Sequence, residues 1–348
     1  MKIALITDTH FGSKDGKAYM HDFFEKFYRD VFFPELERRN IKTVIHLGDA
    51  FDRRKYLDYY SLKRCKEYFF DPLNDAGIFA HVLVGNHDIA LRNSLEINSP
   101  ELVLTEYHNI NPISDPTYLE IESKTLLLMP WVCSDNYAKS MGMLEEGKAD
   151  YVFGHFDIQT FEMHRGMESH EGFEIEKFKG YDRVFSGHYH HRSSKGNITY
   201  LGNPYEMTWS DYNDPRGFHI FDTETGELEF IENPYTLFKR VIYNDSTATG
   251  FDFDTLKDKF IKLVIETKSD YYAYDQFLDK ALTSGAHDIK VMDNLAEMNS
   301  DEMDENVKIE DTQSILKHFV ESAELDVDRT KLSAYISNLY VEALHTTI

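Results

Sequence analysis

Cysteine and long apolar runs are scarce in this chain of 348 residues. Its two cysteines, Cys65 and Cys133, support neither a disulfide framework nor a structural zinc site, which favours a reducing, cytoplasmic setting. No stretch approaches the roughly 20 apolar residues of a membrane helix, and the acidic Asp8 comes too early for a secretion signal. Apolar residues make up 42%, which is enough to fill the core of one large domain plus something smaller.

Basic residues are also in deficit, and the formal net charge is −24. Proteins that grip nucleic acid through its phosphates usually carry a basic surface. The charge therefore argues against strong DNA binding by this chain alone. Part of the acidic excess lies between Asp293 and Asp311, and bound divalent metals would reverse the charge locally at a site.

Five short polar motifs each follow a β-like apolar run. The central motif is Gly85-Asn86-His87-Asp88, which follows the run 78–84. Together the motifs bring Asp, Asn and His side chains from five strand ends, which is the ligand set of a two-metal site that cleaves phosphoesters. The other four motifs are Asp8-Thr9-His10, Gly48-Asp49-Ala50-Phe51-Asp52, Gly154-His155 and Gly187-His188-Tyr189-His190.

The first part of the chain alternates between strands and helices. Apolar patterns predict strands at 2–7, 41–47 and 78–84 and helices at 19–39 and 59–74, with Pro34 breaking or kinking the first helix. This order implies parallel strands joined by right-handed crossovers. Ligands of such sheets gather beyond the carboxyl ends of the strands, where the first three motifs fall.

After about residue 117 the predicted strands are short and closely connected. We expect hairpins at 118–130 and 217–232, and brief strands at 151–153, 183–185 and 198–201. A second, mostly antiparallel sheet packed on the first would bury the inner face of each. The predicted fold class is α/β, a two-sheet αββα sandwich with helices outside, over residues 1–235.

The rest of the chain carries no metal-type motif. Residues 236–293 are predicted to form a small α+β capping domain, and the acidic residues 294–311 a mobile linker. Two short amphipathic helices are predicted within 312–348, and they would pack either on the parent domain or on a partner. Their apolar stripes are Ile315, Phe319 and Ala323, and Leu332, Tyr335, Leu339 and Ala343.

The motif chemistry favours transition metals. Imidazoles mixed with carboxylates suit manganese, iron or zinc better than calcium. Two such ions can clamp a phosphodiester, activate the attacking water and stabilise the leaving oxygen. Asp49 is the natural bridge because a carboxylate has two oxygens to share. Glycines at 48, 85, 154 and 187 would let the backbone turn close to the metals.

The five motifs, present in this order, resemble those of the calcineurin-like metallophosphoesterases. The segment from Asn203-Pro204-Tyr205-Glu206 to Asp214-Pro215-Arg216-Gly217-Phe218 further resembles the end of the nuclease domain in SbcD-type DNA repair nucleases, especially the phage recombination endonuclease subunits of that group. The resemblance covers residues 1–235. The remainder matches in layout, as a capping domain, a tether and helices that in this family dock on the coiled-coil base of an ABC-type ATPase.

The resemblance implies specific roles for the motif residues. One metal would be held by Asp8, His10, Asp49 and His190, and the other by Asp49, Asn86, His155 and His188. His87 would face the scissile phosphate as general acid or transition-state stabiliser, with Asp88 orienting its ring. Asp52 stands where some relatives have a second active-site histidine. It would orient a ligand histidine or line the substrate path, and no catalytic role is assigned to it.

Other polar residues have competing interpretations. Arg53, Arg54 and Lys55 could meet DNA phosphates or form a solvated loop. Tyr56, Tyr59 and Tyr60 could stack on bases, but helix packing explains them as well. His46 and His81 are expected as core or edge histidines rather than ligands. His191 is expected to lie behind the site or in solvent, because successive strand residues point to opposite faces.

Together these features predict a DNA nuclease dependent on two Mn²⁺ ions, with Mg²⁺ as the other candidate. By resemblance it would be a homodimer that binds DNA ends and an ABC-type coiled-coil ATPase. It would trim duplex ends 3′ to 5′ and cut single strands in recombination and double-strand break repair, in the host cytoplasm if a phage encodes it. The alternatives are a metallophosphoesterase acting on a non-DNA phosphoester, which the acidic charge favours, and a non-catalytic scaffold for the ATPase.

Overall fold

The computed structural model describes residues 1–164, 167–169, 172–246, 248–292 and 332. The chain divides into two compact units, which are considered separately. The first comprises Met1–Lys239 and Asp258–Phe260, and the second comprises Arg240–Lys257 and the chain from Ile261 onward. Within the described ranges, no helix has the length and apolar character needed to cross a membrane.

The first unit contains a six-stranded sheet in which the strands before the first three motifs lie side by side. β1, β2 and β3 are parallel, as the alternation of strands and helices predicted. β6, which was not predicted, pairs parallel with β3, and β15 and β16 extend the other edge as antiparallel strands. In order across the sheet the strands are β16 (Leu228–Glu232), β15 (Gly217–Asp222), β1 (Lys2–Ile6), β2 (Thr43–His46), β3 (Phe79–Leu83) and β6 (Ile110–Ile113).

A second six-stranded sheet holds the strands before the last two motifs. The expectation of a mostly antiparallel sheet was wrong: β8, β9, β12 and β14 are parallel, and only the edge strands β7 and β13 are antiparallel. The crossover from β8 to β9 runs through α7 (Tyr137–Glu146), a helix that the sequence analysis did not assign. The order is β13 (Ser193–Lys195), β14 (Ile198–Tyr200), β12 (Arg183–Gly187), β9 (Tyr151–His155), β8 (Lys124–Met129) and β7 (Thr117–Ile121).

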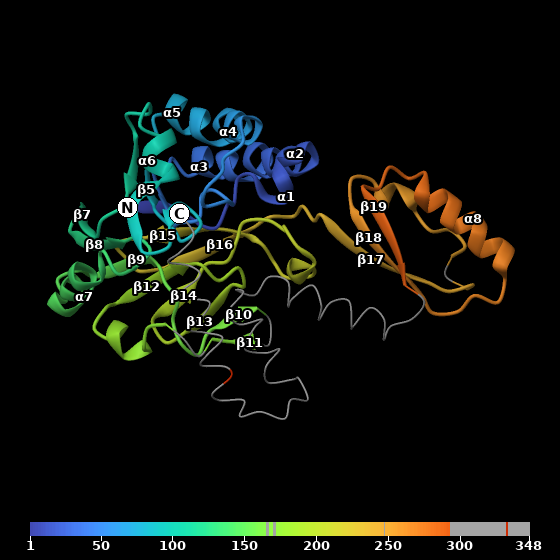
Figure 1. The fold of residues 1–348 in the computed structure, drawn as a ribbon. Coiled ribbons are helices and arrows are strands. Elements are labelled where there is room, and N and C mark those ends of the chain that lie inside the picture. The colour runs from blue at the N-terminus through green and yellow to red at the C-terminus, as the bar shows by residue number, and fades with distance from the viewer. Residues whose placement is uncertain (165–166, 170–171, 247, 293–331, 333–348) are drawn as a thin grey trace. The chain divides into compact units, whose positions relative to one another are not determined.

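The two sheets and their helices form four layers, which confirms the predicted αββα sandwich. Alternate residues of a strand face opposite layers: Ile3 and Leu5 of β1 join the core between the sheets, whereas Ala4 and Ile6 face the helices. Figure 1 shows α2 to α5 on one side of this unit, and the outer face of the second sheet packs on α7 and η3 (Ile175–Phe178). This layering places the carboxyl ends of both sets of parallel strands at the same end of the sandwich.

Two long helices cover the first sheet, and each passes through a π-helical segment before a proline. Pro34 neither breaks nor ends the first helix, because the wider turn of the preceding segment lets the Phe33 N–H bond the Tyr28 carbonyl. The second helix repeats this arrangement before Pro72. The segments are α2 (Ala18–Phe27), η1 (Tyr28–Phe32) and α3 (Phe33–Arg38), then α4 (Tyr59–Cys65), η2 (Lys66–Phe70) and α5 (Asp71–Asp75).

Short elements complete the first unit. They are α1 (Ser13–Gly16), α6 (Ser99–Val103), η4 (Trp209–Asp211) and the hairpins β4 (Ile89–Leu91) with β5 (Ser94–Asn98) and β10 (Glu162–His164) with β11 (Met167–Glu168).

The described part of the second unit is a small α+β structure. The apolar face of its helix α8 (Tyr271–Leu282) packs on a three-stranded sheet in the order β17, β18, β19. The strands are β17 (Phe238–Tyr243), which was not predicted, β18 (Phe260–Ile265) and β19 (Asp288–Met292), with η5 (Phe253–Leu256) beside them. The predicted linker 294–311 and terminal segment 312–348 lie outside the described residues, apart from Leu332.

Glu206, in the segment after β14, is a buried carboxyl whose titration should make the stability of the fold depend on pH. Its side chain accepts hydrogen bonds from the N–H groups of Leu237 and Phe238, at 2.6 and 2.9 Å. Burial outweighs these bonds and raises its pKa from 4.5 to about 7. Between these pH values the folded state keeps a proton that the unfolded chain has lost. The stabilising contribution is therefore complete below pH 4.5 and is lost as the pH rises to 7.

Glu206→Gln is accordingly expected to gain stability relative to wild type between pH 5 and pH 8, because the amide stays neutral. Thermal unfolding of both proteins at the two pH values measures this. Taking the difference between the proteins removes the contribution of other groups that titrate in the same range. A difference that does not change with pH would contradict the raised pKa.

Candidate metal centre

The five motifs meet at the carboxyl ends of five parallel strands, where their side chains form three overlapping clusters. Asp8, His10 and His190 form one cluster, and Asp49, His155 and His188 another. Asp49 also belongs to the third cluster, which it forms with His10 and His87. In each cluster the ligand-type atoms lie within 4.8 Å of one another. Asp49 is therefore positioned to serve two neighbouring ions.

The donor atoms within the clusters point toward one another. Nε2 of His10 lies 3.1 Å from Nε2 of His190, and Oδ1 of Asn86 lies 2.9 Å from Nε2 of His155 and 3.0 Å from Nδ1 of His188. His155 donates from Nδ1 to the Leu47 carbonyl at 2.8 Å, which leaves Nε2 for a metal. The sequence analysis predicted seven metal ligands, and it predicted that His87 faces the scissile phosphate. All eight residues lie in one site.

Sharp backbone turns bring these side chains together. Asp8, His10, Asp49 and His188 all have positive φ, between 42° and 86°. Such a backbone costs a non-glycine residue about 1–3 kcal/mol and clusters at functional sites. Glycine is needed where two turns touch: a Cβ on Gly85 would lie 2.2 Å from Oδ1 of Asp49. The expectation that the glycines make room for metals needs refining, since Gly85 makes room for a ligand side chain.

The electrostatic field of the site favours a cation. Burial alone would lower the pKa of His10, but the nearby carboxylates of Asp52 and Asp49 outweigh it and raise the pKa to about 9. The pKa of His155 also rises to about 9, because Asp49 outweighs the effect of burial. Buried carboxylates that hold protons on two histidines would hold divalent metals in their place. The donor set therefore fits two metal ions.

His87 and Asp88 contact different groups than expected. His87 donates from Nδ1 to the Asp52 carbonyl at 2.7 Å, so its ring is oriented by that carbonyl and Nε2 remains for the substrate. The expectation that Asp88 orients the ring was wrong. The Asp88 carboxylate is fully buried and accepts hydrogen bonds from the N–H groups of Gly85, Ala50 and Phe51. It therefore ties the Asn86-His87 turn to the Asp49 turn.

Asp52 links the metal centre to a surface pocket. Its Oδ1 lies 3.5 Å from Nδ1 of His10, and its carbonyl holds His87. It also lines the pocket together with Arg53 and Tyr56. Asp52 thus contacts a candidate ligand histidine and lines the pocket, and its role at the site stays a prediction.

The calcineurin-like phosphoesterase family model matches residues 1–192. The chain belongs to this family. As a metallophosphoesterase it is an enzyme, and the clusters described above are its candidate metal ligands.

Two relatives align with this metallophosphoesterase beyond the family core. It is 31% identical to exonuclease subunit 1 of Enterobacteria phage T4 over 347 residues, which are 99% of each chain. It is 23% identical to the SbcD subunit of the SbcCD nuclease from Staphylococcus epidermidis over 261 residues, which are 66% of this chain and 67% of the relative. A solved archaeal phosphodiesterase covers 67% of this chain and 100% of its own, at 16% identity and a TM-score of 0.33.

The segment 203–218, which resembles SbcD-type nucleases, holds the backbone of His190, one of the candidate metal ligands. Arg216, only 5% exposed, donates to the carbonyl of His190 and to Oδ1 of Asn203, and it pairs with Asp214 at 2.7 Å and Asp211 at 3.1 Å. The carbonyl of His190 also accepts from the Asn203 N–H at 3.3 Å. The buried guanidinium thus fixes the turn that presents His190. From the sequence, the arginine was visible only as part of a resemblance.

Arg216→Met is expected to lower the free energy of unfolding by about 3–5 kcal/mol, because it leaves two buried carboxylates without their cation. Bound manganese should fall with it, since His190 loses its support. Urea unfolding and metal analysis measure the two effects. Arg29→Met is the matched control, because Arg29 pairs with Asp30 on the surface, and it should change neither. If Arg216→Met is as stable as wild type, the ion pairs of Arg216 with Asp211 and Asp214 do not contribute to stability.

The three other histidines considered from the sequence, His46, His81 and His191, lie outside the clusters. His46 is fully buried and bonds Thr9 Oγ1 at 3.0 Å, and its Nδ1 accepts from the Gly48 N–H at 3.3 Å, so it is a core histidine as expected. His81 is partly buried in β3, and burial lowers its pKa. His191 bonds Asp214 at 2.8 Å and so lies behind the site with Arg216.

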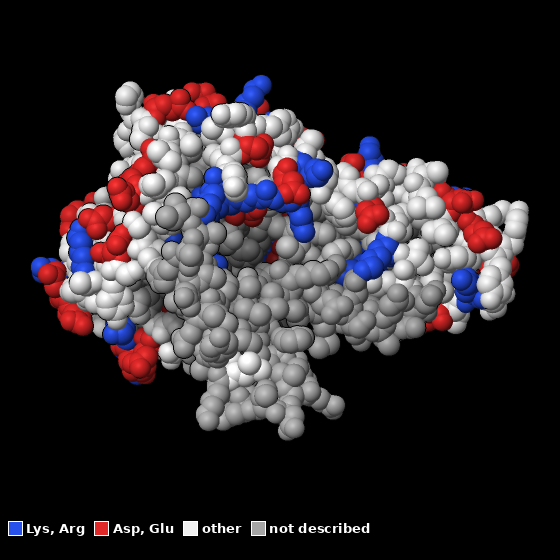
Figure 2. All heavy atoms as spheres, in the orientation of Figure 1, with Lys and Arg blue, Asp and Glu red and all other residues white. Residues whose placement is uncertain are grey.

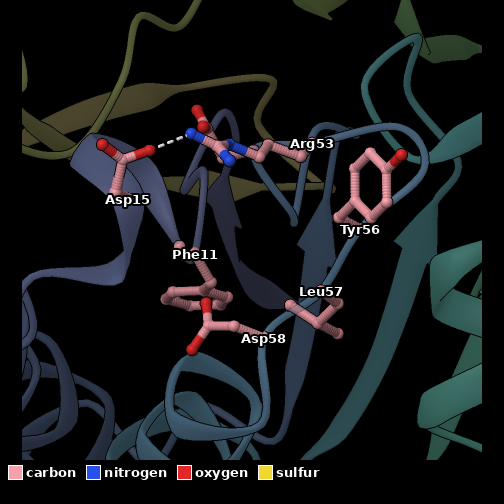
Figure 3. A pocket seen from close by; sticks show the side chains of 8 residues that line it. Phe11, Asp15, Arg53, Tyr56, Leu57 and Asp58 are labelled. Carbon is pink, nitrogen blue, oxygen red and sulfur yellow. Dashed lines mark hydrogen bonds and ion pairs between the residues drawn. The ribbon is translucent and has the colours of Figure 1, made fainter.

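Of the three predicted DNA contacts, Arg53 lines the pocket that Asp52 also lines. Arg53 and Lys55 are exposed and Arg54 is partly buried, and Arg53 pairs with Asp15 across the pocket (Figure 3). Figure 2 shows a short run of Lys and Arg side chains on a face that otherwise carries many Asp and Glu side chains. The predicted partner contacts Ile315, Phe319, Tyr335 and Leu339 lie outside the described residues, and of Leu332 only its helical conformation and partial burial are described.

Proposed function

We propose that this metallophosphoesterase is the manganese-dependent nuclease subunit of an ATPase–nuclease complex. It would degrade duplex DNA ends 3′ to 5′ and cut single strands in recombination and double-strand break repair. The observation that carries the proposal is the alignment with a phage exonuclease subunit along 99% of both chains, motif region and C-terminal part alike. Both relatives are subunits of nucleases, which supports a partner subunit. The ABC-type ATPase as that partner is expected from the resemblance to SbcD-type nucleases. A homodimer is expected from the family resemblance.

The ligand assignment follows the clusters. Asp8, His10 and His190 would hold one ion and Asn86, His155 and His188 the other, with Asp49 shared. When bound, the two ions supply Lewis-acid stabilisation of the phosphate and lower the pKa of the attacking water. A set of imidazole, carboxylate and amide donors suits Mn²⁺.

His87 would act on the leaving group. As water attacks the phosphorus, the bond from phosphorus to the sugar oxygen breaks and that oxygen needs a proton. His87 keeps Nδ1–H on the Asp52 carbonyl, so an imidazolium would give up its Nε2 proton to the departing oxygen. The Asp49 carboxylate accepts from the His87 backbone N–H at 2.8 Å, which keeps the imidazole near the metal ligands.

A comparison of substrates tests the proposal. The protein, with and without a coiled-coil ABC-type ATPase, would be incubated with 5′-labelled linear duplex DNA, circular single-stranded DNA and bis(p-nitrophenyl) phosphate, in Mn²⁺ or EDTA. We expect a shortening ladder from the duplex and linear product from the circle, in Mn²⁺ only.

The net charge of −24 favours the second candidate, a phosphoesterase that acts on a non-DNA substrate. Hydrolysis of the small diester without cleavage of either DNA would support it and overturn the DNA proposal. If the protein neither binds manganese nor hydrolyses any of these substrates, the remaining candidate is a non-catalytic scaffold for the ATPase.

A further inference from the structure

Two tyrosines that follow the second motif in the chain expose their rings. Tyr56 is 75% exposed and Tyr59 is 89% exposed. Among the described residues neither ring has a stacking or hydrogen-bond partner, whereas Tyr60 packs on His21 with ring centroids 5.5 Å apart. Helix packing therefore accounts for Tyr60 and leaves Tyr56 and Tyr59 unexplained.

Tyr56 lines the pocket that Asp52 connects to the metal centre. The pocket wall also includes Arg53, Asp15 and Asp58 (Figure 3). Asp52 in turn contacts His10 and His87. An occupant of this pocket would thus touch Asp52, the residue that contacts His10 and His87.

The charges of the pocket select the kind of occupant. Three carboxylates, of Asp15, Asp52 and Asp58, line it and would repel a phosphate, and Arg53 is already paired with Asp15. A nucleobase suits it better, because its flat face stacks on tyrosine and its amino groups donate hydrogen bonds to carboxylates. Lys55, exposed next to Tyr56 in the chain, supplies a positive charge for the backbone of such a strand.

We infer that Tyr56, with Tyr59 as a second platform, is a stacking subsite for an unpaired base next to the scissile phosphate. The inference rests on the proposed nuclease function and specifies its substrate: a strand whose terminal nucleotides have left the duplex. Stacking on an aromatic ring is largely independent of base identity, so the subsite selects unpaired strands rather than sequences. It would serve both end trimming and single-strand cutting.

A fluorescent base analogue tests the subsite. The full chain in EDTA, which prevents cleavage, would be titrated into DNA with 2-aminopurine in a short single-stranded end and into the blunt duplex. Wild type and Tyr56→Phe should quench the fluorescence of the unpaired end. Tyr56→Ala should bind that end about five- to hundredfold more weakly and lose the quenching, with little change on the blunt duplex. Tyr272→Ala, from an equally exposed ring at 73%, should match wild type.

Several outcomes would overturn the inference. Equal quenching by wild type and Tyr56→Ala would remove Tyr56 from the subsite. Loss of quenching in Tyr56→Phe would indicate that the tyrosine hydroxyl, rather than the stacked ring, makes the contact. An equally large loss of binding to the blunt duplex in Tyr56→Ala would indicate that Tyr56 contacts DNA without selecting unpaired bases. Weakened ATPase binding with intact quenching would make the surface a protein interface. If wild type does not bind DNA but hydrolyses bis(p-nitrophenyl) phosphate, the nuclease proposal has failed as well. A thermal unfolding transition measured for each variant would serve as the check that it is folded.

Discussion

Asp49→Asn is expected to lose both metal ions and on the order of 10³-fold or more in hydrolysis, because metal ions supply several kcal/mol of transition-state stabilisation. Asp49 contributes to two of the three clusters, so losing its charge weakens two sites at once. Its Oδ1 also accepts from the His87 N–H, a bond that an amide would keep only in one orientation. Metal analysis and hydrolysis of bis(p-nitrophenyl) phosphate in Mn²⁺ measure the two losses.

Asp150→Asn is the matched control for this prediction. Asp150 pairs with Lys124 at 2.8 Å at the opposite ends of the strands, beside the start of β9. Its substitution should leave metal content and hydrolysis unchanged. Two ions retained by Asp49→Asn would show that the carboxylate does not bridge them.

His87→Ala is expected to lower DNA hydrolysis by about 10²- to 10⁴-fold while keeping both metals, because it removes a proton donor and no assigned ligand. The backbone N–H that bonds Asp49 remains in this variant. The loss should be smaller with bis(p-nitrophenyl) phosphate, since p-nitrophenolate departs without a proton. Steady-state kinetics on both substrates, with metal analysis, provide the measurement.

His108→Ala, at an exposed histidine away from the clusters, is the control for His87→Ala. Equal losses on both substrates would assign His87 to stabilising the transition state rather than to protonating the leaving oxygen. Loss of a metal ion would make His87 a ligand, a role that its place in a cluster with His10 and Asp49 makes worth testing.

The parallel part of the first sheet and the membership of the site could be predicted because both depend on local pattern. Apolar runs ended by Asp, Asn and His identify strand ends, and parallel strands bring those ends together. The second sheet was harder. Its strands are short, and with α7 unassigned the tight connections suggested hairpins, so its parallel centre was missed.

The roles of single side chains were less predictable. Asp88 adjoins His87 in the chain, which suggested a direct contact, yet it bonds three backbone N–H groups of two neighbouring turns. Arg216 lies 26 residues from His190, whose carbonyl it holds. Nothing in local spacing encodes such contacts, because they depend on how separate loops fold back on one another.

The αββα architecture, the family and the candidate donor residues can be predicted from the chain, because they depend on periodicity and on motifs a few residues long. The division of those residues into overlapping clusters, the carbonyl that orients His87 and the exposure of Tyr56 appear only in the folded protein. Each of these depends on distances between atoms from different strands and loops. Such distances are set by the packing of the whole domain and not by the neighbours of a residue in the chain.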